Sequence, residues 1–178
     1  MSKGERRAMA TDLAGSGGKI LAGGFSQRLC RRLTECIAAL AALEQISSPI
    51  VPYIAAWREH EKIIWYEYVG ARFLALLGCE RREVDEVFRQ SIVDRRLYRY
   101  ADRESKVEED IVTRAELRGE QASLREEVKK AGAVECVYQL ALPGGKKIWL
   151  KDQANIEVFV EDQICLSIGC LTEVTKEM

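Results

Sequence analysis

The stretch of sequence that decides the fold is Ala133–Val174, "AVECVYQLALPGGKKIWLKDQANIEVFVEDQICLSIGCLTEV". Three runs within it alternate apolar and polar side chains, which is typical of antiparallel strands with one buried face. Pro143-Gly144-Gly145 and Glu161-Asp162-Gln163 separate the runs and predict two tight turns. We therefore expect three strands joined as a meander. The positions expected to point inward are Val134, Cys136, Tyr138, Leu140 and Leu142, then Ile148, Leu150, Ala154, Ile156, Val158 and Val160, then Ile164, Leu166, Ile168 and Cys170.

A further pair of strands is predicted upstream of the meander. Pro49–Trp57 and Lys62–Val69 are rich in aromatic and β-branched residues, which favour strands, and a short polar turn joins them. Five antiparallel strands with helices packed on one face make an α+β fold. The helical segments are expected at Gly70–Gly78 and Glu80–Phe88, as a short helix or turn at Ser91–Glu104, and as a charged helix at Lys106–Lys130.

The N-terminal part of the sequence predicts a flexible tail followed by one helix. Residues 1–24 are rich in glycine and serine, whereas residues 25–47 are rich in alanine and carry an apolar stripe. The stripe must be buried either on the rest of the domain or on a second copy of the chain, and the sequence leaves both open. We expect a homodimer, with this helix as a possible dimerisation element. The stripe consists of Leu29, Leu33, Cys36, Leu40 and Leu43.

The composition excludes several classes of protein. The net charge is −1 over 178 residues, so there is no basic excess for a nucleic-acid partner. No run of about 18 apolar residues and no apolar leader occurs, so we expect no membrane contact and a cytoplasmic location. The six cysteines form no CxxC pair and there is one histidine, so no metal site is expected.

Four segments, in order along the chain, resemble the motifs of a PAS domain, the sensory module of bacterial signal-transduction proteins. The resemblance covers about Pro49 to Thr175, with Gly70 standing where the family usually has asparagine. Residues 48–175 are therefore expected to form one PAS-like domain, and residues 176–178 the start of a C-terminal linker. The matching segments are "KIIWYEYVGARFLALLGCERREV" (62–84), Asp94-Arg95, "VYQLALPGGKKIWLKDQANI" (137–156) and "ICLSIGCLTEVTKE" (164–177).

The resemblance implies a five-stranded sheet that cups a small cavity. Such domains sense small molecules, redox state or light, or only mediate pairing, and they lie upstream of histidine kinase or diguanylate cyclase outputs. Glu173-Val174-Thr175 stands for the family's Asp-Ile-Thr, where a connecting helix begins, so these residues are expected to relay a signal. A filled core without a ligand stays equally open. The expected pocket lining is Phe88, Ile92, Cys136, Tyr138, Leu150 and Ile168.

Two cofactor chemistries of the family have no support in the sequence. Ala71 in "GARFL" stands where flavin photosensors carry the cysteine that attacks the flavin, so no nucleophile is present there. The single histidine, His60, falls in the predicted turn between the first two strands and not on a central helix, where a haem ligand would be expected. The cofactor and the ligand are therefore left open.

Two other functions remain to be weighed against a sensory one. The chain could be a pure interaction module in which the N-terminal helix and the sheet pair two copies without a ligand. It could also be a small enzyme on a cone-shaped α+β fold, with Asp152 as general base because Asp152 falls on an otherwise apolar strand face. The plainer interpretation of Asp152 is a residue at a strand bulge or edge. We therefore predict no catalytic residue.

Overall fold

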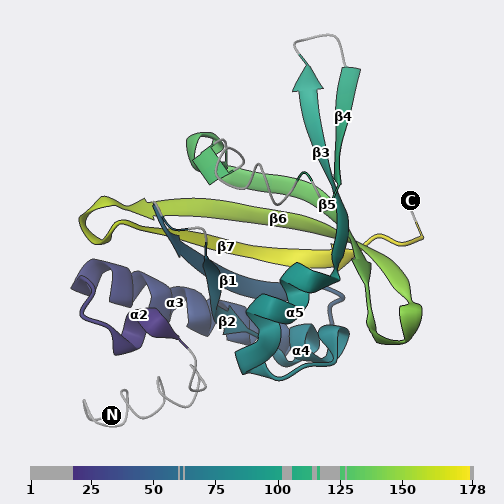
Figure 1. Cartoon of the computed structure of the whole chain (residues 1–178). Coiled ribbons are helices and arrows are strands. Elements are labelled where there is room, and N and C mark those ends of the chain that lie inside the picture. Colours follow the sequence, from purple (N-terminus) through teal and green to yellow (C-terminus); the bar gives the residue numbers. More distant parts are fainter. Residues whose placement is uncertain are drawn as a thin grey trace.

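The computed structural model describes residues 18–59, 61, 63–101, 106–113, 116, 125–126 and 128–176. The described strands form one antiparallel sheet of seven in the order β2-β1-β7-β6-β5-β3-β4 (Figure 1). The strands are β1 (Val51–Arg58), β2 (Ile64–Val69), β3 (Ile92–Ala101), β4 (Lys106–Thr113), β5 (Ala133–Ala141), β6 (Lys147–Phe159) and β7 (Ile164–Glu173). The helices are α2 (Lys19–Ala22), α3 (Gln27–Glu44), α4 (Ala71–Leu77) and α5 (Val84–Ser91), with short 3-10 turns η1 (Arg81–Glu83), η2 (Pro143–Gly145) and η3 (Val160–Asp162).

The α+β class and the C-terminal meander are confirmed. Strands β5, β6 and β7 pair antiparallel in sequence order, and the two predicted turns lie at η2 and η3. The predicted end of the helical segment Gly70–Gly78 is also confirmed, since Gly78 ends α4 in the left-handed conformation with φ of 65°. Strands β1 and β2 are therefore followed by α4 and α5, as predicted, and the meander ends the fold.

The segment after α5 differs from the prediction, because β3 and β4 form a hairpin where a turn and a charged helix were expected. The sheet consequently has seven strands and not five, and the hairpin projects beyond the rest of the sheet in Figure 1. The C-terminal end of β4 contains the β-branched residues Ile111, Val112 and Thr113, which pair with Arg96, Arg95 and Asp94 of β3. β-branched residues favour a strand over a helix.

The sheet is covered on both faces, whereas the sequence predicted helices on one. Successive residues of β1 alternate, so that Tyr53 and Ala55 belong to one apolar cluster while Ile54 and Ala56 belong to another. Residues of α4 and α5 pack into the first cluster, and residues of α2 and α3 pack into the second. We call these two sides of the sheet the α4 face and the α3 face.

The apolar stripe of the N-terminal helix is buried on the chain's own sheet. Leu29 and Leu33 are fully buried, Cys36 is 6% exposed, and Leu40 and Leu43 are half-buried. All but Leu43 pack with the cluster on the α3 face. Pairing of two chains through this helix stays a prediction, and it would have to use the outer side of α3, because the stripe is already covered.

Part of the expected flexible tail is a short helix anchored in the core. Ile20 of α2 is fully buried, and the buried carboxylate of Glu67 accepts hydrogen bonds from the backbone N–H groups of Lys19 and Ile20 at 2.9 and 3.0 Å. The indole N–H of Trp65 donates to the same oxygen. Residues from 18 onward therefore belong to the folded domain, while residues 1–17 lie outside the described part of the chain.

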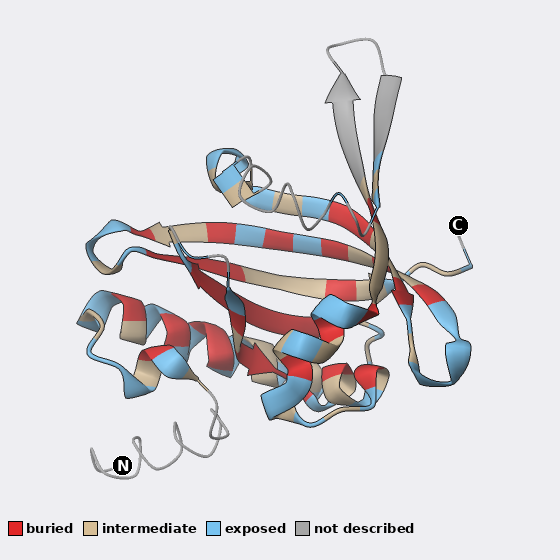
Figure 2. Cartoon of the chain, viewed as in Figure 1, coloured by how far each residue is buried: buried red, intermediate tan, exposed pale blue. Residues whose placement is uncertain are grey.

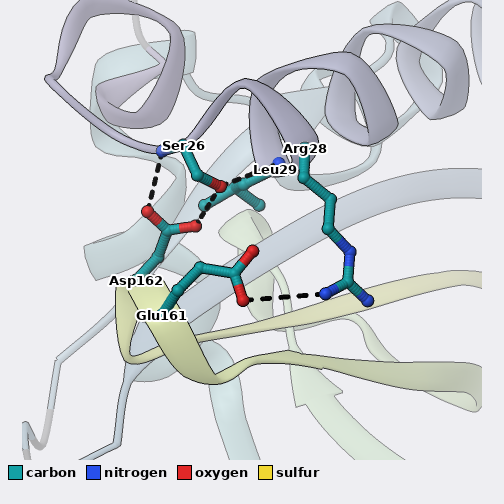
Figure 3. Close-up of polar contacts among 5 residues, drawn as sticks. All are labelled: Ser26, Arg28, Leu29, Glu161 and Asp162. Carbon is teal, nitrogen blue, oxygen red and sulfur yellow. Dashed lines mark hydrogen bonds and ion pairs between the residues drawn. The ribbon is translucent and has the colours of Figure 1, made fainter.

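The N-terminal end of α3 is tied to the turn between β6 and β7 (Figure 3). Asp162 accepts hydrogen bonds from the backbone N–H and the hydroxyl of Ser26, at 2.8 and 2.5 Å. The Ser26 hydroxyl in turn accepts the N–H of Leu29 at 3.2 Å, which is the usual arrangement of a helix N-cap. Arg28 and Glu161 add an exposed ion pair at 3.6 Å. The turn thus fixes where α3 begins.

The predicted inward positions are correct for most of β5 and β6. Buried and exposed residues alternate along β6 (Figure 2), but Val160 lies beyond the strand and is 74% exposed, while Phe159 is buried on the α3 face. In β7 the predicted set Ile164, Leu166 and Ile168 faces α3, not the face that carries the inward residues of β5 and β6. Alternation separates the residues of a strand into two sets, but it does not say which side of the sheet each set faces. Here both sides are covered, so both sets contain apolar residues.

Candidate functional site

The predicted pocket lining is brought together on the α4 face, with one exception. Phe88 and Leu150 are members of the apolar cluster there, and Ile92 and Tyr138 pack against it. Cys136 is fully buried on β5, opposite Asp152 of β6. Ile168 was placed wrongly, because it packs on the α3 face with the cluster under α3. The candidate site is therefore the α4 face without Ile168.

A buried polar cluster lies within this apolar surface, and Asp152 is its centre. Asp152 is 5% exposed on a strand paired on both sides, so neither a bulge nor an edge accounts for it. The hydroxyl of Tyr53 donates to its Oδ1 at 2.6 Å from two strands away. The same hydroxyl lies 3.4 Å from the hydroxyl of Ser167 on the intervening strand β7. The carboxylate is thus held across three adjacent strands.

Arg95 of β3 supplies a buried positive charge to this cluster. It is 8% exposed, lies opposite Tyr138 in the strand register, and its guanidinium carbon is 5.5 Å from the centre of the Tyr138 ring. Its Nε is buried and has no hydrogen-bond partner in the described structure. A buried donor without an acceptor typically costs about 1–3 kcal/mol, so the cluster is not fully satisfied by the chain itself.

Burial favours the protonated forms of the acidic side chains in this cluster over their anions. Burial raises the pKa of Asp152 to about 6, although hydrogen bonds from Tyr53 and Tyr138 and the charge of Arg95 oppose that rise. Burial likewise raises the pKa of the Cys136 thiol to about 11, and it raises the pKa of Tyr53 and Tyr138 well above the usual tyrosine value. Asp152 is therefore the member whose charge changes close to neutral pH, and Cys136 is no thiolate nucleophile.

A layer of aromatic rings connects the polar cluster to the helices. Tyr53 packs edge-on against Tyr66, Tyr66 against Phe73 of α4, and Phe73 against Phe88 of α5, with ring centroids 5.4–5.9 Å apart. Phe88 contacts Tyr138 in the same way at 5.8 Å. Edge-to-face packing of this kind fixes ring orientation. A shift at Tyr53 or Tyr138 would therefore be transmitted directly to α4 and α5.

The three predicted relay residues lie at the end of β7 and are fastened to β6. The backbone N–H of Val174 donates to the carbonyl of Trp149 at 2.8 Å, and the N–H of Trp149 donates to the Thr175 hydroxyl at 3.0 Å. That hydroxyl donates to Glu173 at 2.9 Å. The position fits an exit from the domain, and the relay role itself stays a prediction.

Sequence reasoning found part of this site and missed the rest. Asp152 was singled out because it interrupts an apolar alternation, and Tyr138 and Cys136 were found from the same alternation. Arg95 was missed as a site residue because its segment was interpreted as helix or turn, and Tyr53 because Pro49–Trp57 is apolar at almost every position. The usable signal for a strand at Arg95 was the content of β-branched and aromatic residues in "IVDRRLYRY".

The cofactor expectations concern positions away from this cluster. Ala71, which stands for the photosensor cysteine, is exposed in the first turn of α4. His60 lies outside the described residues. Among the residues that the structure describes, no group of three His, Cys, Asp or Glu side chains is arranged to hold a metal ion. None of the described helices is long and apolar enough to cross a membrane.

Solved PAS and light-oxygen-voltage domains are similar to this chain at low identity. A PAS domain from a two-component sensor histidine kinase has 10% identity over 79% of this chain and 98% of that chain, with a TM-score of 0.46. A PAS domain from Colwellia psychrerythraea has 11% identity over 79% and 98%, and a light-oxygen-voltage domain 12% over 79% and 87%, both with a TM-score of 0.46. No protein-family model and no curated protein matches the sequence.

These similarities carry no inference about ligand, output or assembly. The chain has a PAS-like α+β fold on the evidence of its own elements: two strands, the helices α4 and α5, and the meander β5-β6-β7, with β3 and β4 added beside β5. The fold implied by the sequence resemblance is therefore present, with a longer sheet.

Proposed function

We propose that this chain is a sensory or regulatory PAS-like module, whose sensing site is the polar cluster around Asp152 on the α4 face. The observation that carries the proposal is a buried charged group, Asp152 with Arg95, set into an aromatic layer that reaches two helices. Stability alone rarely favours such a group, because desolvating two charges costs several kcal/mol per ion. Its proton affinity and its unsatisfied donor suit a site that responds to a ligand or to pH.

We further propose that the chain acts as a homodimer and passes its signal to an output of the histidine kinase or diguanylate cyclase type, in cis or in trans. Support comes from the resemblance of Glu173-Val174-Thr175 to the family's exit motif and from its place at the end of β7. The domain itself is expected to be non-catalytic. Hydrogen bonds from Tyr53 and Tyr138 occupy the carboxylate of Asp152, which leaves it poorly placed as a general base.

The first test is native mass spectrometry of the protein purified without added ligand. We expect a dimer that carries a defined extra mass, which is lost under denaturing conditions. Tyr53→Phe and Asp152→Asn should lower the fraction of protein that carries this mass, because each removes a polar group of the site. Tyr68→Phe is the matched control, since Tyr68 is equally buried but packs on the α3 face.

Each alternative function predicts a different result from the same measurement. A dimer without extra mass would support a ligand-free interaction module. An extra mass that Tyr53→Phe and Tyr68→Phe reduce equally would place the ligand elsewhere and overturn the assignment of the site. Isomerase or hydrolase activity that is lost in Asp152→Asn would instead support a small enzyme with Asp152 as its base.

A further inference from the structure

Helices α3 and α4 are joined by caps that each helix supplies to the other. The carboxylate of Glu44, the last residue of α3, accepts the backbone N–H groups of Ala71 and Arg72 at 3.1 and 3.2 Å, at the start of α4. In return the guanidinium of Arg72 donates to the carbonyls of the chain that leaves α3. These are the carbonyls of Glu44 at 2.7 Å, Ser48 at 2.6 Å and Ile50 at 3.1 Å, and that of Ile46.

These contacts, which we call the Glu44–Arg72 joint, provide hydrogen-bond partners for backbone groups that a helix end would otherwise leave unpaired. The first N–H groups and last carbonyls of a helix have no partner within it, and charged side chains satisfy them strongly. Arg72 has five N–H donors in a fixed planar fork, so it can hold several carbonyls in one geometry. The two helices are therefore bound end to end, although they lie on opposite faces of the sheet.

The sequence is adapted to the joint at Gly70. A Cβ at this position would lie 1.9 Å from the carboxyl carbon of Glu44, although the backbone φ of −84° would admit any residue. A residue with a Cβ at this position would therefore displace the carboxylate of Glu44 from the start of α4, whereas the backbone conformation does not call for glycine. This accounts for the glycine that replaces the asparagine expected from the sequence resemblance.

The joint lies between the candidate site and the N-terminal helix. On one side, fully buried Phe73 of α4 contacts Tyr66 and Phe88, and its ring centroid is 6.4 Å from that of Tyr53, the residue that binds Asp152. On the other side, α3 is packed on the opposite face of the sheet. An unbroken chain of packed and hydrogen-bonded groups therefore runs from the polar cluster to α3.

We propose that the Glu44–Arg72 joint couples the state of the Asp152 cluster to helix α3, so that the N-terminal helix is an element through which the domain reports that state. This rests on the proposed function for the identity of the site, but the coupling itself needs no ligand. It differs from the predicted relay at Glu173-Val174-Thr175, which leaves the domain at the far end of β7. A signal that leaves through the Glu44–Arg72 joint should be interrupted by substitutions at the joint. A signal that leaves through the end of β7 should be interrupted by substitutions there instead.

The test is native-state hydrogen exchange of the full chain without ligand, with Tyr53→Phe as the perturbation at the site. With the joint intact, Tyr53→Phe should speed exchange at the C-terminal turn of α3 by at least about fivefold, the lower end of typical coupling between sites. In an Arg72→Gln background, Tyr53→Phe should still speed exchange in α4 but add nothing in α3. The exchange rates of β5 and β6 report global unfolding. The change that each variant causes in these rates is therefore subtracted from the changes measured in α3 and α4.

Matched substitutions separate the joint from a general loss of stability. Arg82→Gln removes an exposed arginine that pairs with Glu80, and Glu35→Gln neutralises an exposed carboxylate on α3, so both should leave the coupling intact. Glu44→Gln is the milder second break if Arg72→Gln does not fold. An α3 response to Tyr53→Phe that survives the broken joint, or one that is absent while α4 responds, overturns the proposal. Failure to find a ligand would bear only on the proposed function.

Discussion

Asp152 is a carboxylate inside an apolar layer, and its proton affinity has a consequence for stability. Its pKa in the folded chain is about 6, against 3.8 for an ordinary aspartate, so the folded state binds the proton more tightly than the unfolded state. The stabilisation from this proton is complete below pH 4 and is lost as pH rises through 6. The groups that surround the carboxylate, Tyr53, Ser167, Tyr138, Arg95 and Cys136, keep their charge over this range.

We predict that Asp152→Asn removes this pH dependence. The free energy of unfolding of the variant relative to the natural chain should rise by about 2 kcal/mol between pH 4 and pH 6, out of about 3 kcal/mol over the whole titration. Urea unfolding of both proteins at several pH values measures it. Glu67 and Asp85 also have a raised pKa from burial, but both are present in the two proteins and cancel. Glu161→Gln, at a half-exposed carboxylate, is the control, and a difference that stays constant with pH would refute the prediction.

Gly70 provides a second test at the scale of one residue. Gly70→Ala should cost about 1–2 kcal/mol of unfolding free energy, because the new methyl group displaces Glu44 and uncaps α4. In a Glu44→Ala background the same change should cost almost nothing, since the clash is gone and alanine restricts the unfolded chain. A double-mutant cycle in urea measures the difference. Equal costs in the two backgrounds would mean that Gly70 serves some other purpose.

At the scale of elements, the N-terminal end of α3 depends on one contact between distant segments (Figure 3). Ser26→Ala should lower the free energy of unfolding by about 1 kcal/mol through loss of the N-cap. Ser26→Asp should cost more than Ser26→Ala, although aspartate is a good N-cap elsewhere, because it would face the carboxylate of Asp162. Adding Asp162→Asn should remove that excess. If Ser26→Asp is as stable as the natural chain, Asp162 does not set the cap.

The elements that the sequence predicted are those whose local signals agree with their tertiary surroundings. Alternation and glycine turns identified the meander, and an unbroken apolar stripe identified α3. The hairpin β3–β4 was missed because "KVEEDIVT" is rich in helix-compatible charges, and its partner is a separate strand, Ile92–Ala101, that comes earlier in the sequence. Local propensity gives way to such non-local pairing. Arg95 belongs to the site because its segment is a strand that pairs with β5, which places Arg95 opposite Tyr138.

At the scale of the whole molecule, what the sequence could not show was how the two faces are divided. Every strand of the meander alternates, yet β7 presents Ile164, Leu166 and Ile168 to α3, and it presents Ser167 and Gly169, together with Leu171, toward the side of Tyr53 and Ala154. Close approach at Gly169 leaves only 2.4 Å between a Cβ there and that of Ala154. With both faces covered, no sequence pattern distinguishes the face that carries the proposed sensing site from the other.

Because α3 completes the core, we predict that a chain lacking residues 1–47 does not fold cooperatively. Deletion uncovers apolar residues of the α3 face, and it removes Ile20, Leu29 and Leu33, which are fully buried. Truncating one such side chain costs about 2–5 kcal/mol, whereas a whole domain is stable by about 5–15 kcal/mol. Thermal unfolding followed by near-ultraviolet circular dichroism measures it, with deletion of residues 2–17 as the control that keeps every contact described above.

The same deletion cannot serve as a test of dimerisation. If the shortened chain aggregates, the loss of a dimer reports an exposed core and not a lost helix pair. Substitutions at Ala38 and Ala42, which are exposed on the outer side of α3, leave the core intact and change only a surface that a second copy could contact. Should residues 48–178 instead unfold cooperatively near the temperature of the full chain, α3 would be an appendage, and the coupling through Glu44 and Arg72 would lose its structural basis.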